Sequence, residues 1–245
     1  MANWSDPQSN AAAFGASTGV RGAAYDAGLR SYMLSVYNYM TSAVLLSGIV
    51  ALGFALSGAA AQVFVAGGIL KWIITFAPLG FIFAMSFGQG RMSTGTLQLM
   101  FWGFSIAMGL SLSTIFLVYS EMAIAQAFFA TAASFAGLSL WGYTTKRDLS
   151  AMGTFLLMGL IGLIVASLIN LFVQSGPFAF VISLVGVLLF AGLTAYDTQR
   201  TKSLYAQVAG TEFEGRVAIM SALNLYLDFI NMFLFILRLF GSSRN

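Results

Sequence analysis

The fold is decided by the stretch Ala222-Leu-Asn-Leu-Tyr-Leu-Asp-Phe-Ile-Asn-Met-Phe-Leu-Phe-Ile-Leu-Arg-Leu-Phe-Gly241. A helix of this length crosses the hydrocarbon core of a bilayer, which is about 30 Å thick. The stretch nevertheless places one carboxylate, Asp228, among apolar side chains. It therefore predicts a transmembrane helix with an acidic group inside the membrane.

The composition of the whole chain is that of a membrane protein. Of its 245 residues, 59% are hydrophobic and only 8% are charged, whereas soluble domains carry roughly 25% charged residues. The chain has no cysteine and no histidine, which excludes disulfides, thiolate and Ser-His catalysis, and the common zinc and haem sites. Its 11 Lys and Arg residues are too few for a nucleic-acid-binding surface. We expect no cofactor and no nucleic-acid partner.

Seven apolar stretches of 19 to 22 residues follow a polar start. They are Val36–Leu56, Ile69–Phe87, Leu97–Val118, Met122–Tyr143, Met152–Val173, Phe178–Tyr196 and Met220–Phe240. We expect an all-α bundle of seven transmembrane helices, forming a single domain over residues 36–245 in the lipid bilayer. Residues 1–35 are expected to form a polar tail with an interfacial helix over residues 22–35. The last stretch could alternatively form a re-entrant hairpin.

Basic residues are distributed unevenly between the two sets of loops. With the N-terminus inside, eight lie on the inner side: Arg21, Arg30, Arg91, Lys146, Arg147, Arg200, Lys202 and Arg216. Three lie outside: Lys71, Arg238 and Arg244. The positive-inside rule therefore predicts a cytoplasmic N-terminus. Minimal loops favour a bacterial cytoplasmic (inner) membrane, and an endoplasmic-reticulum location stays open.

Polar residues form a stripe on the last predicted helix. At 100° per residue, five of them fall within an arc of about 100°: Ser221, Asn224, Asp228, Asn231 and Arg238. Thr194 and Asp197 share a face of the sixth stretch, and Asn170 lies on the fifth. Such groups face the bundle interior or a water-filled path, because a charge in the membrane costs roughly 2.5–3.5 kcal/mol. The asparagines could equally serve as hydrogen-bonding contacts between helices.

Asp197 and Asp228 are the candidates for a pH sensor and ion pathway. If they meet across helices, they cannot both ionise cheaply in a poorly hydrated site, so they share a proton. In a chain without histidine, such a pair is the most plausible source of a response between pH 5 and 8. When ionised, the pair offers hard oxygen ligands for a transient Ca²⁺. Asp197 could instead form a simple ion pair with Arg200, and Glu121 could attract cations to an entrance.

Five segments together resemble the Bax inhibitor-1 (transmembrane Bax inhibitor motif) family, from about residue 30 to the C-terminus. They are Val36-Tyr-Asn-Tyr-Met40, Ala127-Phe-Phe-Ala-Thr-Ala-Ala-Ser-Phe135, Tyr143-Thr-Thr-Lys-Arg-Asp-Leu149, Ala195-Tyr-Asp-Thr-Gln199 and Leu223-Asn-Leu-Tyr-Leu-Asp-Phe-Ile-Asn231. One departure is that Gly109-Leu110 stands near the place where the family often has a Gly-Pro pair.

The resemblance implies a bundle whose last helix is surrounded by the other six. It also implies a pH-sensitive calcium leak in which Asp197 and Asp228 form the proton-sensing pair. In some members a basic residue of the second span latches the pair; the candidates for an entrance or latch here are Glu121, Arg91 and Arg238. Similar bacterial proteins include a modulator of a membrane-bound ATP-dependent protease. The alternative is therefore a non-conducting partner of such a protease or stress complex, binding through the N-terminal tail and an inner loop over residues 197–219.

An enzyme is not expected. The aspartates resemble the pair that activates water in intramembrane aspartyl proteases, but Asp228 lacks the Gly-x-Gly-Asp context and the following Pro-Ala-Leu of that class. A rhomboid-type protease is excluded by the missing histidine. A retinal protein is not expected, because the last span has no lysine that could form a Schiff base.

Overall fold

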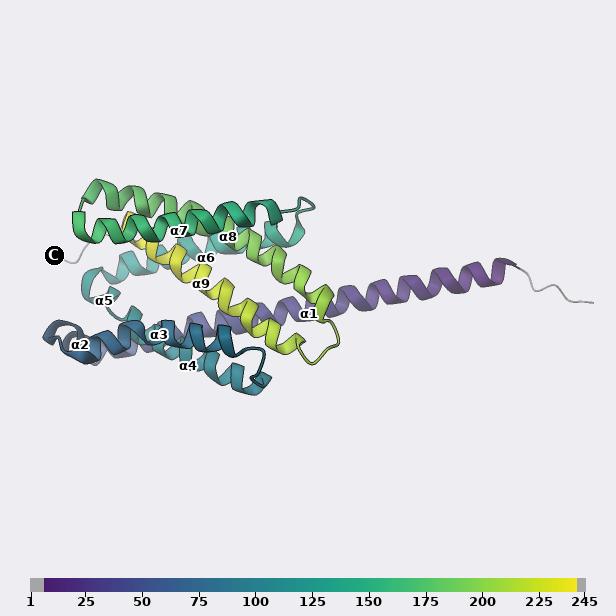
Figure 1. The fold of residues 1–245 in the computed structure, drawn as a ribbon, viewed down its shortest axis with the longest axis horizontal. Helices are drawn as coiled ribbons and strands as arrows, with labels where there is room; N and C mark the ends of the chain where they lie inside the picture. Colours follow the sequence, from purple (N-terminus) through teal and green to yellow (C-terminus); the bar gives the residue numbers. More distant parts are fainter. Residues whose placement is uncertain (1–6, 242–245) are drawn as a thin grey trace, which may run out of the picture.

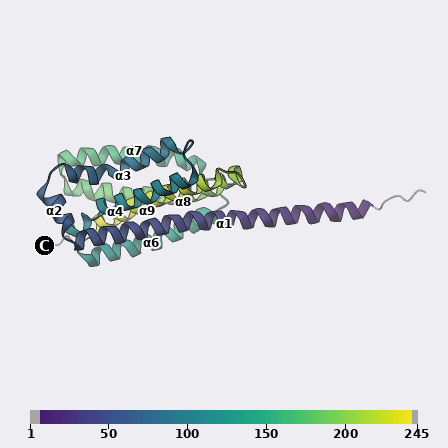
Figure 2. The ribbon, with the colours of Figure 1, turned by 90° about the horizontal axis from the view of Figure 1, so that it is seen from below.

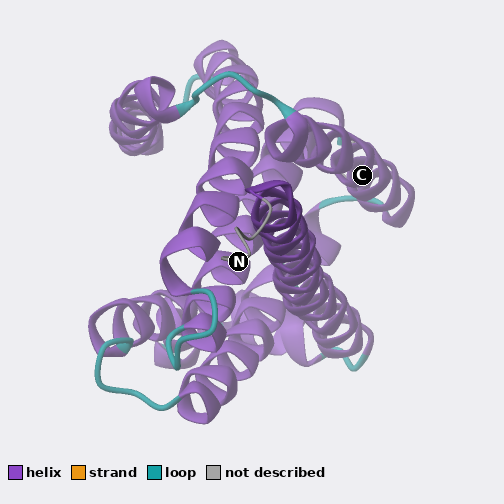
Figure 3. Cartoon of the chain, turned by 90° about the vertical axis from the view of Figure 1, so that its right-hand side faces the viewer, coloured by secondary structure: helices purple, strands orange, loops and turns teal. Residues whose placement is uncertain are grey.

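The computed structural model describes the backbone of residues 7–241 and the side chains of residues 24–241. Within this part, the chain forms helices joined by short loops and no strands, as Figure 3 shows. The helices are α1 (Pro7–Leu56), α2 (Ala59–Ala66), α3 (Ile69–Gly88), α4 (Thr94–Leu112), α5 (Ile115–Val118), α6 (Glu121–Thr144), α7 (Ser150–Val173), α8 (Gly176–Val208) and α9 (Glu214–Phe240).

The predicted all-α class with seven membrane-spanning helices is confirmed. The described residues contain seven helical segments long and apolar enough to cross a membrane. They are Ala24–Leu56, Ile69–Gly88, Thr94–Val118, Glu121–Thr144, Ser150–Val173, Gly176–Val208 and Glu214–Phe240. The last of them is one continuous helix rather than a re-entrant hairpin.

Short polar caps set the helix boundaries. The side chains of Ser93, Ser120 and Ser175 accept hydrogen bonds from backbone N–H groups three residues later, at the starts of α4, α6 and α8. Such caps satisfy donors that a helix leaves free at its N-terminus. Pro177 stands in the first turn of α8, where its missing N–H costs nothing. The caps make short loops possible between adjacent spans.

Two helices extend beyond the predicted spans. α1 is continuous through residue 35, and its first half projects from the bundle (Figures 1 and 2). The division into a tail and a transmembrane domain stays a prediction. α8 runs on to Val208, so most of the inner loop expected over residues 197–219 is helical. The reason is tertiary: Tyr205 is buried against Tyr25 and Tyr32 of α1, with ring centroids 5.4 and 5.2 Å apart.

The last helix is the most buried of the spans. In its most apolar stretch, 72% of the residues are buried, against 39% or fewer in each of the other six. It packs against α1, α4, α6 and α8, and crosses the bundle diagonally in Figure 1, while α3 packs on α4 and α7 on α8. The implied ring of six helices around it stays a prediction, because the contacts of α9 among the described residues are mainly with four.

Two of the closest contacts between helices are possible because one residue of each contact is glycine, which has no side chain. A Cβ atom on Gly109 would lie 2.7 Å from the backbone oxygen of Ser47, so glycine lets α4 approach α1. A Cβ atom on Gly142 would collide with the backbone carbonyl of Ala195, where α6 meets α8. Close backbone approach of this kind stabilises helix pairs in lipid, where apolar burial alone provides little drive. The second contact lies two residues before Asp197 and so helps to position it.

Candidate functional site

Asp197 on α8 and Asp228 on α9 meet inside the bundle. Their side chains lie within hydrogen-bond reach of each other. Asp228 is only 5% exposed, and Asp197 is half-buried. Two carboxyl groups can share a hydrogen bond only when one of them carries a proton, because an ionised carboxylate has no donor. The structure thus brings together the two acidic residues that the sequence singled out.

The pair lies in a cavity of about 460 Å³ between α7, α8 and α9. Its polar wall comes from α8 and α9, and its apolar wall comes mainly from α7. The lining residues are Gly153, Leu157, Leu160, Ile164, Phe190, Leu193, Tyr196, Asp197, Arg200, Asn224, Leu227, Asp228 and Asn231. A Cβ atom on Gly153 would lie 2.5 Å from the Tyr196 ring, so this glycine gives the ring its place against α7.

The charge of the pair is poorly balanced by the surrounding protein. The Oδ2 atom of Asp228 is buried and meets no hydrogen-bond donor among the described residues. Arg200 is the nearest compensating charge and acts on Asp197, but it makes no ion pair within 4.0 Å to a carboxylate of the described residues. An ionised carboxylate without donors is costly in a buried site. The site therefore favours a bound proton or cation over a bare pair of negative charges.

The pair is too small a ligand set for a resident calcium ion. Ca²⁺ takes about 6–8 oxygen ligands, and no group of three or more acidic, histidine or cysteine side chains suited to a metal occurs among the described residues. Asn224 and Asn231, whose side-chain amides also line the cavity, could add two oxygens. Water would have to supply the rest, which suits a transiently bound ion. The predicted metal ligation by Asp197 and Asp228 stays a proposal.

The residues of the predicted polar stripe lie in different environments in the structure. Asn224 is exposed at the cavity, and Asn231 donates its Nδ2 hydrogen to the Leu227 carbonyl at 2.8 Å. Ser221 is buried on the side of α9 that faces Tyr32 of α1, away from the cavity. The residues of the stripe share one arc of the helical wheel. Because α9 lies between several helices, they nevertheless contact different neighbours.

Thr194 and Asn170 have local structural roles. Thr194 is buried and donates to the Phe190 carbonyl at 2.8 Å, within its own helix. Asn170 accepts a hydrogen bond from the backbone N–H of Ser175 at 3.1 Å, which closes the turn between α7 and α8. Neither residue lines the cavity. The structure does not bring them to the aspartate pair, although the sequence grouped them with it.

The candidates for an entrance or latch lie away from the pair. Glu121 begins α6 and lines a separate, mostly apolar cavity of about 300 Å³. Arg91 is exposed in the loop between α3 and α4, and Arg238 is exposed in the last turn of α9 over the Phe235 ring. The basic residue that lines the cavity of the pair is Arg200.

Residues 29–245 match the family model described as inhibitor of apoptosis-promoting Bax1. The chain belongs to the Bax inhibitor-1 family. Among its relatives is the uncharacterized protein RP147 of Rickettsia prowazekii, 45% identical over 90% of this chain and 93% of that protein. The inner membrane protein YbhL of Escherichia coli is 40% identical over 89% of this chain and 94% of its own length. An uncharacterized protein of Caulobacter vibrioides is 42% identical over 89% of this chain and 91% of that protein.

These relationships place this Bax inhibitor-1 protein in a bacterial membrane. Its seven spans make it an integral membrane protein, and the relationship to YbhL supports the inner membrane as its location. The family is one of membrane channel-type and regulatory proteins and is not a known enzyme family.

This Bax inhibitor-1 protein has two networks of buried hydroxyl groups that were not predicted from the sequence. On the face of α8 turned toward α6, Ser139 bonds to both Thr198 at 2.9 Å and Tyr37 of α1 at 2.7 Å. Elsewhere, the Tyr226 hydroxyl bonds to Ser47 at 2.7 Å, and Ser47 donates to a backbone carbonyl of α4. A single hydroxyl residue on an apolar helix has no charge and belongs to no spacing pattern, so nothing in the sequence distinguishes it. Only their partners on other helices reveal them.

Proposed function

We propose that this protein is a pH-sensitive calcium leak in which Asp197 and Asp228 serve as the proton sensor and as ion ligands. The observation that supports it most directly is the contact between the two carboxyl groups inside a cavity of about 460 Å³. A buried acidic pair has a cost in lipid that a structural role alone would not require, since an amide could form the same contact more cheaply.

The pair offers a physical link between protonation and helix packing. One proton shared by two carboxyl groups holds α8 to α9 through a hydrogen bond. Without the proton, two like charges in contact repel unless a cation neutralises them. Protons and Ca²⁺ therefore compete for the same oxygens, and the outcome changes the force between the two helices.

The cavity gives the ion a route to the pair. Asn224 is exposed and Arg200 is exposed, while Asp228 is buried, so the lining runs from an accessible edge to the buried carboxyl. Amide and carboxylate oxygens along such a path can replace part of the hydration shell of Ca²⁺. Arg200 repels cations when the pair is protonated and is attracted to the pair when it is ionised.

The decisive experiment measures calcium flux into proteoliposomes between pH 5 and 8. For the unmodified protein we expect flux that changes with pH, and for Asp228→Asn we expect the pH dependence to be lost. Asp148→Asn, which removes an exposed carboxylate from the loop between α6 and α7, is the matched control and should keep the dependence. An unchanged pH profile in Asp228→Asn would reject the assignment.

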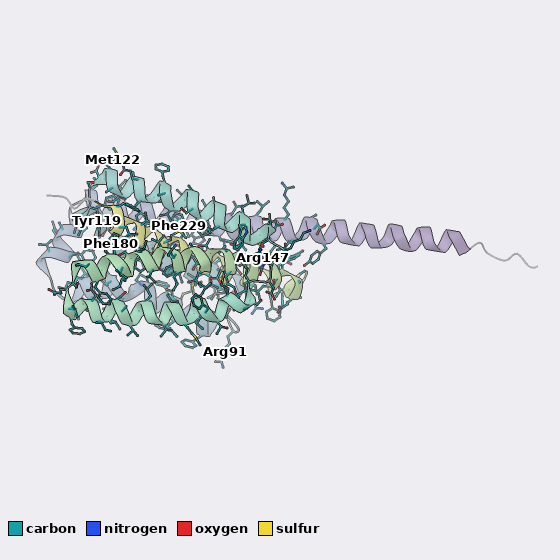
Figure 4. The ribbon with its side chains drawn as sticks, turned by 90° about the horizontal axis from the view of Figure 1, so that it is seen from above. Arg91, Tyr119, Met122, Arg147, Phe180 and Phe229 are labelled. Carbon is teal, nitrogen blue, oxygen red and sulfur yellow. The ribbon has the colours of Figure 1, made fainter. Side chains whose placement is uncertain are left out.

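We also propose that the N-terminus is cytoplasmic. Arg91 and Arg147 lie toward the end of the bundle from which α1 projects, whereas Tyr119 and Met122 lie toward the other end (Figure 4). The excess of basic loop residues is therefore on the side of the N-terminal helix, which is the pattern that the positive-inside rule predicts for a cytoplasmic face. Labelling of a single cysteine introduced at Ser31 or Ser57, in intact cells, tests the orientation.

A second candidate function is that of a regulatory partner of a membrane-bound ATP-dependent protease. The supporting observation is the first half of α1, which extends past the other helices of the bundle (Figure 2). Deletion of residues 1–25, of which residues 1–6 lie outside the described part, should abolish pull-down of the protease and leave calcium flux intact. Retained pull-down with lost flux would contradict this role.

A further inference from the structure

A long groove lies between α1 and α6 and shares no lining residue with the cavity of the aspartate pair. It has a volume of about 640 Å³, with walls from α1 and α6 and a floor that includes Phe229 of α9. α1 packs against α4 and α9, and α6 packs against α8 and α9, so the two helices border the groove without packing closely on each other. Figure 2 shows both along the same edge of the bundle.

The groove is apolar and faces the lipid. Buried Met33, Met40 and Phe135 form part of its base, while Leu34 and Leu140 on its rim are 52% and 64% exposed. Two polar groups at its base, the Tyr37 hydroxyl and the Ser139 hydroxyl, form a hydrogen bond with each other at 2.7 Å. They therefore need no hydrogen bond from a molecule bound in the groove. A dry groove of this kind in a bilayer is filled by hydrocarbon rather than by water.

The dimensions of the groove suit an extended acyl chain. Its lining on α1 runs from Arg30 to Leu45, which is about 22 Å of helix at 1.5 Å per residue. One leaflet of hydrocarbon is roughly 15 Å thick, half of the bilayer core. The groove also reaches from the middle of the bundle, where Phe229 lies, toward the end that carries Arg147 (Figure 4). A chain lying in it would reach the membrane surface at that end.

At that end the groove joins a basic pocket. Tyr143 lines both the groove and a second cavity of about 560 Å³, which is also lined by Lys146, Arg147 and Lys202. Lys202 is held at this junction, because its Nζ atom donates to the Tyr143 carbonyl at 3.0 Å and lies 5.0 Å from the centre of its ring. Arg30 lines the adjoining end of the groove itself.

Acidic residues compensate only part of this charge. Asp26 and Asp148 also line the basic pocket, and Asp148 is engaged by the backbone N–H of Ser150 at 2.9 Å. None of the four basic side chains forms an ion pair with a carboxylate within the described residues. Four positive charges against two negative ones leave an excess of +2 beside the mouth of an apolar groove. Basic residues placed at the membrane surface attract anionic lipid headgroups.

We propose that this end of the bundle is a binding site for one anionic phospholipid, with an acyl chain in the groove between α1 and α6 and the phosphate of its headgroup at Lys146 and Arg147. The basic pocket selects the charge of the headgroup, and the groove holds the chain. Neither feature is part of the cavity around the aspartate pair.

Native mass spectrometry of the full chain, released from detergent with phosphatidylglycerol or phosphatidylcholine of identical oleoyl chains, tests the proposal. The unmodified protein should retain one phosphatidylglycerol in preference to phosphatidylcholine. In the double variant Lys146→Gln/Arg147→Gln, affinity for phosphatidylglycerol should fall about 25-fold, since each basic residue near the surface contributes roughly fivefold. Arg91→Gln, an exposed basic residue of another loop at the same end (Figure 4), is the control and should bind normally.

A second pair of variants tests the groove. Ala136→Trp places a large ring in the groove and should weaken binding of both lipids, whereas Ala133→Trp, an equally exposed position of α6 outside the lining, should not. Glycerol 3-phosphate, which has a phosphate and no chains, should not displace the bound lipid. Equal retention of the two lipids, normal binding in either test variant, or displacement by glycerol 3-phosphate would overturn the proposal.

Discussion

Asp228, buried on α9, is in hydrogen-bond reach of Asp197 on α8, and the buried Oδ2 atom of Asp228 has no hydrogen-bond donor within the described residues. The contact needs a proton, because Arg200, the nearest cation, forms no ion pair within 4.0 Å to either carboxylate among the described residues. This arrangement distinguishes the pair from an ordinary interhelical hydrogen bond, which would form at any pH.

The variant Asp228→Asn should reduce the pH dependence of stability. An amide can donate to Asp197 whether or not that carboxyl is ionised. In the unmodified protein the bond contributes below the pH at which the shared proton is lost and vanishes above it. At pH 8 we expect the variant to be more stable by about 1–3 kcal/mol. Thermal unfolding in detergent between pH 5 and 8 measures this, and parallel curves for the two proteins would refute it.

The contact between α6 and α8 should not tolerate a methyl group. In Gly142→Ala, the new Cβ atom meets the backbone carbonyl of Ala195, and a backbone atom cannot rotate away. We expect a loss of about 1–3 kcal/mol in the free energy of unfolding. Gly137→Ala on the same helix has nothing within 4 Å of its Cβ position and should be neutral or slightly stabilising. Equal effects of the two substitutions would contradict this account.

Removing one hydroxyl from the buried network of α9 should weaken its docking on α1. Tyr226→Phe keeps the ring and loses the 2.7 Å bond to Ser47. Hydrogen bonds between membrane helices contribute on average about 0.6 kcal/mol and up to roughly 2 kcal/mol, so we expect a loss in that range by reversible unfolding in micelles. Tyr39→Phe, whose hydroxyl has no hydrogen bond within the described residues, is the control. An equal or larger loss in the control would show that the bond to Ser47 does not account for the effect.

Acid should weaken the loop between α6 and α7. Hydrogen bonds from the Ser150 hydroxyl and backbone N–H lower the pKa of Asp148. A carboxyl whose folded pKa lies below the unfolded value of about 3.9 contributes stability above that pH and loses it as pH falls through the folded pKa. The difference in unfolding temperature between the unmodified protein and Asp148→Asn should therefore be constant above about pH 5 and shrink toward pH 3. A difference that stays constant down to pH 3 would contradict the link.

The seven spans were predictable because their cause is local. Lipid demands about 20 apolar residues in sequence for each crossing, and the chain meets that demand seven times, so the predicted and observed ends of Ile69–Gly88 and Ser150–Val173 differ by only a few residues. The end of α8 was missed for the converse reason. The helix continues beyond the apolar stretch, and Tyr205 stabilises the continuation by packing on two rings of α1 that lie 173 and 180 positions earlier in the chain.

The sequence alone determined that two carboxylates lie on the last two helices, since the cost of a charge in lipid makes each of them conspicuous. Only the tertiary structure decided that Asp197 and Asp228 touch, that Ser221 faces α1 instead, and that Asn170 closes a turn. A helical wheel gives the direction of a side chain about its own axis. Which neighbour stands in that direction depends on how the helices cross, and that is set by contacts such as Gly142 on Ala195 between residues far apart in the chain.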